Sequence, residues 1–291
     1  MAHLILAAVP LGNPGDASKR LIEALLSARV IAAEDSRKLS RLCKDLGITH
    51  TARVISFFEG NESERVVELL EILKSGIDVL VVTDAGMPSV SDPGYRLVRV
   101  AIDNEIGVKV LPGPSAVLTA LAISGLPTDR FCFEGFAPRT SGARDTWFQK
   151  LAEEERTIVF FEAPHRLHES LIAAAGALGS DRDAVICREL TKTYEEIVRG
   201  KLDQLIVWAS EKEILGEITL VIAGFNPSSR EFVPAEIIAK VLAVSKNRTD
   251  TRIYVRGDKT INYGRVLEIM GLLSGSGFTK VALISEPLKQ R

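Results

Sequence analysis

The chain has 291 residues, of which 46% are hydrophobic and 25% charged, and its formal net charge at pH 7 is −2. This composition is typical of a globular protein, and the length is sufficient for two domains. The spacing of Cys43, Cys132 and Cys187 indicates neither a disulfide framework nor a zinc site. No apolar run reaches the length of a membrane span, and the N-terminus lacks the features of a signal peptide. We therefore expect a cytoplasmic protein with no metal and no membrane partner.

The net charge hides an asymmetry along the chain. Residues 226–291 hold 11 Lys and Arg against 6 Asp and Glu, which gives a net charge of +5, whereas residues 1–225 carry −7. A protein held mainly by contacts to phosphates is not expected to have an acidic body. If the ligand is RNA, its footprint must be local.

The first part of the chain alternates short apolar strands with helical patterns of period 3.6. Strands are predicted over residues 3–9, 30–33, 53–58, 79–83 and 108–111. Helices are predicted over residues 17–28, 39–46, 62–75, 95–104 and 117–124. Strands and helices that alternate at this spacing predict a parallel α/β sheet.

The stretch from residue 79 to residue 94 organises this part of the chain. Its five apolar or β-branched residues predict a buried strand, which ends at Asp84 and runs into a turn containing Gly86 and Pro88. A carboxylate in this position lies at the carboxyl edge of a parallel sheet, where open α/β sheets bind ligands. The alternative is that Asp84 only caps the next helix or closes a turn, and this stretch alone does not decide between the two.

Two further strands end in polar loops. The turn over residues 10–16 lacks the G-x-G-x-x-G spacing of a dinucleotide loop, but it indicates close backbone approach by a ligand or a neighbouring loop. After the second strand, Ser36 is predicted to cap the next helix. Asp35 and Arg37 gain a role in a site only if their loop lies beside Asp84.

At residue 112 a Pro-Gly-Pro-Ser run opens an apolar helix with Ser115 at its N-cap, and from residue 131 the pattern of elements changes. We place a domain boundary at residue 112. Strands are predicted over residues 131–136, 157–161, 184–187, 200–202 and 217–223, and helices over residues 144–155, 165–177 and 201–211. This pattern predicts a mixed α/β second domain with antiparallel pairs.

Polar clusters follow two of these strands, at residues 162–166 and 188–192. His165 is the only histidine at a strand-to-helix junction, where a structural role and a catalytic or RNA-binding role both stay open. The stretch over residues 139–150, which contains Arg144, is interpreted as a polar loop. It is a mobile lid, an RNA-contacting segment or an ordinary loop, and the sequence leaves all three open.

Seven motifs in this order carry a resemblance to a known family. They read VPLGN from residue 9, AAEDSR from 32, TDAGMP from 83 with DPG from 92, LPGPS from 111, FCFEGF from 131, FEAPHR from 161 and RELTK from 188. Over residues 1–225 the sequence closely resembles the ribosomal RNA small subunit methyltransferase I family, of the tetrapyrrole-methylase-like class. The resemblance implies two α/β domains, 1–112 and 113–225, with a methyl donor bound in the cleft between them, usually in a homodimer.

The same resemblance implies S-adenosylmethionine as the donor and the ribose 2′-hydroxyl of a cytidine in the decoding region of small-subunit (16S) rRNA as the acceptor. Carried over position by position, it implies donor contacts from Pro10, Leu11, Gly12, Asp84, Met87, Ser115, Ala116, Ala163, Thr219 and Leu220. Methyl transfer is an in-line displacement, in which positioning and exclusion of water do much of the work and no metal is required.

The ribose hydroxyl also needs a proton acceptor or an electrostatic partner. The candidates are the acids and the histidine of the motifs, namely Asp35, Glu162, His165 and Glu189. The candidates for contacts with RNA are Arg37, Arg144, Arg166, Arg188 and Lys192. The sequence does not rank the members of either set.

Beyond residue 225 the methyltransferase motifs stop. Residues 226–230 are predicted to be a linker, followed by a helix over 236–246, a strand over 251–256, a turn at 257–259, a helix over 263–274 and a strand over 280–285. Residues 231–288 resemble the periplasmic domain of ExbD/TolR transport proteins, without the membrane helix that anchors that domain. We interpret residues 226–291 as an interaction or dimerisation module whose positive charge can add RNA affinity.

Two other functions stay open from the sequence. One is methylation of a small tetrapyrrole-like metabolite on the same scaffold, and the other is a non-catalytic envelope or interaction role defined by the C-terminal module. The motifs at residues 162–166 and 188–192 favour RNA over a small metabolite. The lack of a membrane segment in the sequence argues against the envelope role.

Overall fold

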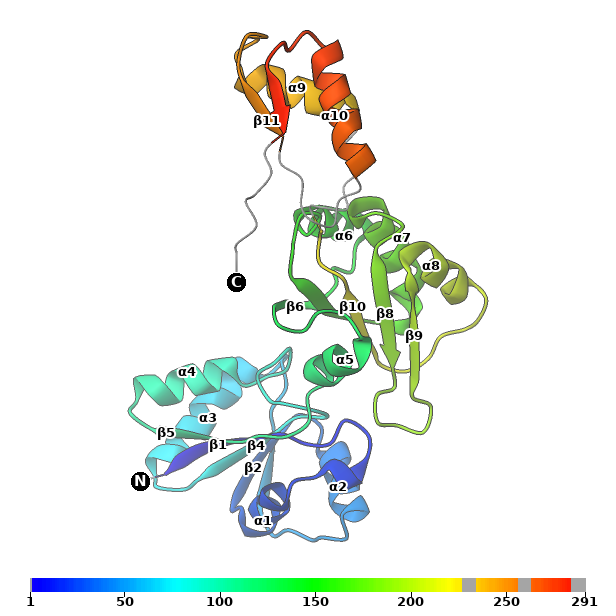
Figure 1. Cartoon of the computed structure of the whole chain (residues 1–291). Helices are drawn as coiled ribbons and strands as arrows, with labels where there is room; N and C mark the ends of the chain where they lie inside the picture. The colour runs from blue at the N-terminus through cyan, green and yellow to red at the C-terminus, as the bar shows by residue number, and fades with distance from the viewer. Residues whose placement is uncertain (1, 227–233, 256–262, 284–291) are drawn as a thin grey trace, which may run out of the picture. The chain divides into compact units, whose positions relative to one another are not determined.

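A computed structural model describes residues 2–226, 234–255 and 263–283 of the chain. The chain divides into two compact units, Met1–Phe225 and Asn226–Arg291 (Figure 1). The first unit contains two five-stranded sheets. We call the part built on the first sheet the first lobe and the part built on the second sheet the second lobe.

The first lobe is built on a parallel sheet with the strand order β3-β2-β4-β1-β5. Its strands are β1 (His3–Ala7), β2 (Val30–Ala33), β3 (Arg53–Ser56), β4 (Val79–Val82) and β5 (Gly107–Leu111). Its helices are η1 (Pro14–Asp16), α1 (Lys19–Ser27), α2 (Ser36–Asp45), α3 (Glu62–Lys74) and α4 (Tyr95–Asp103).

Helices cover both faces of this sheet (Figure 1). Val79 and Val81 of β4 pack with α3 and α4, whereas Leu80 and Val82 pack with α1 and α2. Because alternate side chains of a strand point to opposite faces, a strand covered on both sides is apolar throughout. This explains why β4 reads as an unbroken apolar run in the sequence.

The second lobe begins with α5 (Ala116–Ser124) and has the strand order β6-β7-β10-β8-β9. Its strands are β6 (Phe131–Phe136), β7 (Thr157–Glu162), β8 (Asp183–Arg188), β9 (Glu196–Lys201) and β10 (Ile218–Ile222). Its remaining helices are α6 (Ser141–Lys150), η2 (Pro164–Arg166), α7 (Leu167–Leu178) and α8 (Leu202–Ser210). β6 pairs with β7 in parallel, and the other three pairs are antiparallel.

A loop of the first lobe is built into the core of the second. One face of the second sheet packs on α6, α7 and α8, and the other packs on α5. Leu11, from the loop after β1, lies in the apolar cluster on the α5 face, together with Leu121 and Val221. The parallel first sheet and the mixed second sheet confirm the predicted α/β fold class.

The loops after β1 and β4 meet at the carboxyl edge of the first sheet. Val9 N donates to Gly86 O at 2.9 Å and Gly86 N donates to Val9 O at 3.1 Å, which forms an isolated bridge. β1 and β4 are neighbours in the sheet, so this bridge brings together two segments that are more than seventy residues apart in the chain. It fixes the start of the loop that carries Asp84.

Three predicted local features are wrong. Asp35, not Ser36, is the N-cap of α2, because its Oδ1 accepts from Arg37 N at 2.8 Å. β9 runs over Glu196–Lys201 rather than residues 200–202, since it pairs with β8 along its full length. The polar loop predicted over residues 139–150 is mostly helical, since α6 spans Ser141–Lys150, and the helix predicted over 144–155 therefore begins and ends earlier than expected.

The second unit contains α9 (Pro234–Val244), β11 (Ile253–Val255), α10 (Tyr263–Gly275) and β12 (Val281–Leu283). β11 and β12 pair in parallel. This confirms the predicted order of helix, strand, helix and strand. The predicted linker residues 227–230 and the predicted turn at 257–259 lie outside the described residues. Within the described part of the chain, no helix has the length and apolarity needed to cross a bilayer.

Candidate active site

A cavity of about 350 Å³ lies between the carboxyl edge of the first sheet and the second lobe. The loops after β1, β2 and β4 form one wall, and α5, β6, β7 and the segment leading into β10 form the other. The volume is within the range of small-molecule sites in proteins. We call it the central cavity. Most of its lining is apolar, and carboxylates from both lobes are part of its wall.

The aromatic part of this wall comes from the second lobe. Phe136 at the end of β6 and Phe161 on β7 both line the cavity, with ring centroids 5.2 Å apart. A flat apolar surface of this kind suits a planar heterocycle, because aromatic rings bury large areas in offset or edge contacts. This wall can therefore receive a nucleobase.

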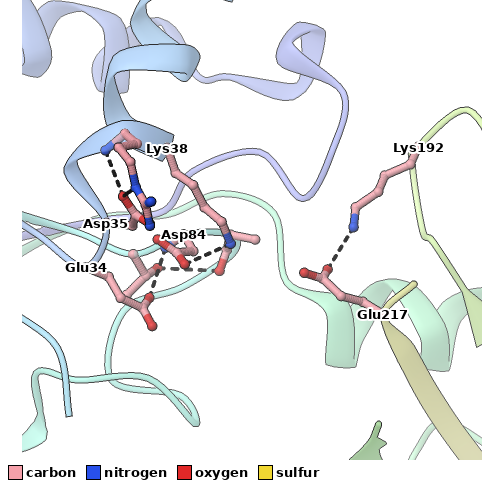
Figure 2. Close-up of polar contacts among 9 residues, drawn as sticks. Glu34, Asp35, Lys38, Asp84, Lys192 and Glu217 are labelled. Carbon is pink, nitrogen blue, oxygen red and sulfur yellow. Dashed lines mark hydrogen bonds and ion pairs between the residues drawn. The ribbon is translucent and has the colours of Figure 1, made fainter. Parts of the chain in front are cut away.

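The polar part of the wall is a cluster of Glu34, Lys38 and Asp84 in the first lobe (Figure 2). Glu34 follows β2 and Asp84 follows β4, and these parallel strands are neighbours. Asp84 N donates to Glu34 Oε2 at 3.1 Å, and Lys38 Nζ lies 2.8 Å from Asp84 Oδ2. The loop after β2 thus lies beside Asp84. This meets the condition set from the sequence for a role of Asp35 and Arg37 in a site.

Burial and neighbouring charges shift the pKa values in this cluster. Burial raises the pKa of Glu34, a shift that the hydrogen bond from Asp84 N opposes and the charge of Asp84 reinforces. The hydrogen bond to Asp84 raises the pKa of Lys38. The cluster holds two acids and one ammonium group, so its side of the cavity attracts a cation more than an anion.

A second cavity, of about 1100 Å³, adjoins the central one. Both cavities are lined by Glu34, Ser91, Asp92, Phe136 and Ala163. The second cavity also contains the cationic and acidic residues Glu59, Glu62, Arg139, His165, Arg166 and Glu169. It is large enough for part of a second reactant.

A third cavity, of about 760 Å³, shares Leu11, Lys38, Asp84, Ala85 and Glu217 with the central cavity. The loops after β1 and β8 and helix α2 form the rest of its lining. Lys192 Nζ lies 2.8 Å from Glu189 Oε1 and 3.0 Å from Glu217 Oε2, and Figure 2 shows its pair with Glu217. Burial alone would raise the pKa of Glu189, but hydrogen bonds from Lys192 and Glu217 N lower it. Burial would lower the pKa of Lys192, and both carboxylates raise it. This triad ties the loop after β8 to the segment before β10.

The two lobes also touch beside this triad. Asn13 N donates to Thr191 Oγ1 at 3.2 Å. A Cβ on Gly12 would lie 2.1 Å from Lys192 Cγ, so the loop after β1 needs glycine to pack against that side chain. The Gly-rich turn after β1 is therefore explained, at least in part, by contact with a neighbouring loop.

Glu162 has no exposed surface, although it belongs to the wall of the central cavity. Its Oε1 lies 2.6 Å from Arg166 Nη2 and accepts from Ala163 N at 2.7 Å, and its Oε2 accepts from Ser170 Oγ. A buried carboxylate with this many partners is fully satisfied. The network holds the turn from β7 into η2 and α7.

The residues predicted to contact the methyl donor divide into three groups. Those that line the central cavity are Leu11, Asp84, Met87, Ser115, Ala116, Ala163 and Thr219. Pro10 and Gly12 line the third cavity instead. Leu220 lies in the core on the opposite face of β10 from Thr219, with its side chain among α6, α7 and α8, so its side chain makes no part of the cavity.

Of the predicted catalytic candidates, Glu162 lines the central cavity, His165 the second and Glu189 the third. Asp35 is not among the lining residues of any of the three. It caps α2, and Arg37 Nη2 lies 2.7 Å from its Oδ2. The pKa of Asp35 is well below its usual range because of the hydrogen bonds from Arg37.

The residues predicted to contact RNA also differ in exposure and in their partners. Arg37 is 90% exposed, whereas Arg166 and Lys192 line the second and third cavities and are paired with acids. Arg188 Nε lies 3.1 Å from Glu196 Oε2 and links β8 to β9. Arg144 is 3% exposed, and its Nη2 lies 2.9 Å from Glu169 Oε2. It therefore has almost no surface with which to contact a phosphate, and we do not propose it as an RNA contact.

Four charged residues of the site were missed as candidates from the sequence, namely Glu34, Lys38, Asp92 and Glu217. Glu34 and Asp92 lie inside the quoted motifs. Lys38 follows the second motif directly. Glu217 precedes β10, where the apolar strand pattern gives no sign of a functional acid.

Comparison with known proteins gives the family. A profile of the Tetrapyrrole (Corrin/Porphyrin) Methylases matches residues 3–206. Ribosomal RNA small subunit methyltransferase I of Mycobacterium tuberculosis (strain CDC 1551 / Oshkosh) is 54% identical over 247 residues, which cover 82% of this chain and 86% of the relative. The chain belongs to this methyltransferase family. A relative of the same name from Micromonospora olivasterospora is 43% identical over 284 residues, covering 97% of this chain and 87% of the relative.

The alignment with the Micromonospora relative bears on the C-terminal unit. Because it covers 97% of the chain, it extends well beyond residue 225. Residues after that point therefore align within the rRNA methyltransferase family, and the resemblance of residues 231–288 to ExbD/TolR proteins is not supported.

Solved structures share the fold. Uroporphyrin-III C-methyltransferase from Thermus thermophilus, complexed with S-adenyl homocysteine, aligns with a TM-score of 0.55 and 17% identity over 77% of this chain and 97% of that chain. Diphthine synthase aligns with a TM-score of 0.57 and 17% identity, over 77% of this chain and 90% of that chain. At these identities the likeness shows the tetrapyrrole-methylase fold alone.

Proposed function

We propose that this chain transfers a methyl group from S-adenosylmethionine to the ribose 2′-hydroxyl of a cytidine in small-subunit (16S) rRNA. The observation that carries this proposal is membership of the ribosomal RNA small subunit methyltransferase I family. The structure supports it with a central cavity lined by seven of the residues predicted to contact the donor. We place the lobe boundary near residue 112, so that the donor lies between residues 1–112 and 113–225.

The residues of the central cavity fit this donor. The donor combines a purine, a ribose and a methionine tail with a positively charged sulfur. Phe136 and Phe161 supply an apolar wall for the purine, and the acids of the cluster suit the positive charges. Asp84 Oδ1 is buried and, among the described residues, has no hydrogen-bond partner, so it is available to a donor group of the ligand.

The donor supplies the electrophile, a methyl group on a positively charged sulfur. The chain's own residues bind and orient it. The Val9–Gly86 bridge holds the loops after β1 and β4 together at the edge of the cavity. A Cβ on Gly86, whose φ is +75°, would lie 3.3 Å from Leu11 Cδ2, so the cavity floor is tightly packed there. Enclosure of this kind fixes geometry and excludes water from an in-line displacement.

The second cavity is the proposed place of the acceptor nucleotide. It adjoins the central cavity along a shared wall, and Arg139, His165 and Arg166 are among the residues that line it. Arg166 is paired with Glu162, which leaves Arg139 and His165 as the groups free to face a phosphate or a base. We propose contacts to the rRNA backbone by these two residues and by Arg37, whose side chain is 90% exposed.

The charge of the C-terminal unit supports a role in RNA binding. Residues 1–225 carry a net charge of −7, whereas residues 226–291 carry +5. Phosphate contacts supply a large share of protein–nucleic acid affinity, so a basic unit in the same chain as an acidic one can add affinity for the substrate. We propose this in place of an envelope function for residues 226–291.

Two further features belong to the same proposal. An rRNA substrate implies action in the cytoplasm, where ribosomes are assembled. The enzyme is proposed to act as a homodimer. Leu118 and Ile123 are exposed apolar residues on α5 and line a shallow pocket there, which supports this proposal.

Methyl transfer to isolated subunits tests the function. The purified chain is incubated with donor labelled in its methyl group and with either small ribosomal subunits, protein-free 16S rRNA or large subunits as the control. We expect label in small-subunit rRNA, in a nucleotide whose 3′ linkage resists alkali because its 2′-oxygen is methylated. Label in a tetrapyrrole added in parallel, with none in either form of the small-subunit RNA, would overturn the proposal.

A further inference from the structure

Asp92 lies where the central and second cavities meet. Asp92 lines both cavities, as does Ser91 of the same loop. If the donor lies in the central cavity and the acceptor nucleotide in the second, a group on the shared wall is within reach of both reactants.

The loop that carries Asp92 has an unusual and well-anchored backbone. Ser89 and Ser91 have φ values of 71° and 60°, in the left-handed region that non-glycine residues seldom occupy. Ser89 N donates to Pro93 O at 3.3 Å, and Gly94 N donates to the buried side chain of Glu62 at 3.0 Å. Backbone of this kind persists where surrounding contacts hold it, and it is common at functional sites. Asp92 is therefore held in place between two anchored positions.

The carboxylate of Asp92 differs from the other acids of the site in its partners. Among the described residues, no hydrogen bond or ion pair to Asp92 is recorded. The other acid of the shared wall, Glu34, accepts a hydrogen bond from Asp84 N, and Asp84, Glu162 and Glu189 each pair with a cation, namely Lys38, Arg166 and Lys192. A carboxylate that accepts strong hydrogen bonds or pairs with a cation is a weaker base. Asp92 is thus the acid of the shared wall that is most available to take a proton.

We infer that Asp92 is the general base of the methyl transfer, a catalytic residue that receives the proton of the ribose 2′-hydroxyl. The inference rests on the proposed function. As the 2′-oxygen forms its bond to the methyl carbon, the bond from that carbon to sulfur breaks, and its electron pair stays on sulfur as a neutral thioether. The hydroxyl proton passes to the Asp92 carboxylate and then to solvent.

The charges around Asp92 favour this role at neutral pH. Burial, with the charges of Glu34, Asp84 and Glu217, raises the pKa of Asp92 to about 7, and Lys38 opposes the shift. The other charged or titratable residues that line the second cavity, on the other side of Asp92, are Glu59, Glu62, Arg139, His165, Arg166 and Glu169. A general base works best when its pKa is near the operating pH. A cationic donor in the central cavity lowers the pKa of Asp92, so donor binding itself prepares the base.

Proton release on donor binding tests the titration of Asp92 without turnover. Calorimetric binding at pH 7 is measured in buffers of different ionisation enthalpy, with S-adenosylmethionine and with its demethylated thioether product. We expect the wild type to release a fraction of a proton with the cationic donor and less with the neutral thioether. In Asp92→Asn the difference between the two ligands should vanish. Equal release by the wild type and Asp92→Asn would overturn the inference.

The pH dependence of turnover tests the chemistry. We expect Asp92→Asn to lower kcat by about 10²–10⁴-fold while the donor affinity stays within a few-fold. The wild-type rate should rise with pH and level off, whereas the residual rate of the variant should lack that rise. Asp92→Glu should restore part of the rate, and Asp103→Asn, the same change on the exposed outer surface of α4, should match the wild type.

Failure of this inference is distinguishable from failure of the proposed function. If the wild type methylates small-subunit rRNA and Asp92→Asn does so at the same rate, Asp92 is not the base. If Glu34→Gln, rather than Asp92→Asn, removes the rise with pH, the base is Glu34, the other acid that lines both cavities. If the wild type methylates no form of the rRNA, the proposed function itself fails, and the proton-release comparison still decides whether Asp92 titrates with the donor.

Discussion

Lys38 Nζ lies 2.8 Å from Asp84 Oδ2, and this ion pair joins the first turn of α2 to the loop after β4. Both residues line the central and third cavities. The pair brings one cation into an otherwise acidic wall, which sets the charge that a ligand meets there. Removing either partner changes that charge by one unit at the edge of the cavity.

Asp84→Ala should lose affinity for the donor. The change removes a carboxylate from the cavity wall and leaves Lys38 unpaired, so a cationic ligand is repelled where it was attracted. We expect the dissociation constant of S-adenosylmethionine to rise by at least about tenfold, or about 1.4 kcal/mol, measured by calorimetry. Asp103→Ala, on the exposed outer surface of α4, is the control and should bind as the wild type does. An unchanged affinity in Asp84→Ala would remove Asp84 from the donor site.

Lys192→Met should destabilise the first unit and change how its stability depends on pH. Glu189, with its lowered pKa, contributes stability that is present above its unfolded value of about 4.3 and is lost as the pH falls through the lower folded value. Lys192, with its raised pKa, contributes stability that is present below about 10.4 and is lost as the pH rises through the higher folded value. The variant should lose both contributions.

Urea unfolding between pH 3 and pH 11 measures this effect. We expect the free energy of unfolding of Lys192→Met at pH 7 to fall by about 1.5–3 kcal/mol, as for other hydrogen bonds to charged groups. Lys74→Met, which breaks an exposed pair with Glu71 on α3, should change it by less than about 0.5 kcal/mol. If both variants lose the same small amount, the triad does not stabilise the contact between its two segments.

The sequence was sufficient to predict most helices and strands and the edge of the first sheet at which the site lies. β4 is covered on both faces, so its apolar run and terminal Asp84 were readable without any tertiary information. β9 was harder, because its sequence EIVRGK lacks the alternation of charged and apolar residues that marks a half-buried strand, and it is an edge strand beside β8. Its start at Glu196 is set by that partner, which lies outside the local sequence.

The site was less predictable than the fold, because charge partners are set in three dimensions. Glu162 and Asp92 both lie in polar stretches of quoted motifs, and nothing in the local sequence separates a buried, paired acid from a free one. Arg144 looks exposed in a Gly-containing segment, yet α6 turns it inward toward Glu169. Pairing and burial decide these roles, and both depend on distant residues.

Glu162 and Arg166 should act as a stabilising pair. Arg166→Met leaves a carboxylate with no exposed surface without its cation, which costs about 3–5 kcal/mol in comparable sites. Adding Glu162→Gln to that variant should recover part of the loss, and the recovery measures the coupling between the two. Arg139→Met, from the same cavity, is the control and should leave the free energy of unfolding within about 0.5 kcal/mol. If Glu162→Gln alone keeps full stability and abolishes methyl transfer, Glu162 is catalytic rather than structural.

Removal of residues 227–291 should weaken RNA binding and its dependence on salt. Each phosphate contact that is lost reduces the slope of log affinity against log salt by about 0.7 for single-stranded RNA. Because Met1–Phe225 is a compact unit, the truncated chain should keep its thermal transition and its affinity for S-adenosylmethionine, and both are measured as controls. Lys240→Gln with Lys246→Gln, two exposed cations in and just after α9, should move the slope in the same direction by less. An unchanged slope after truncation would show that the positive charge of residues 226–291 does not contact the RNA, and the phosphate contacts would then have to lie on the acidic first unit.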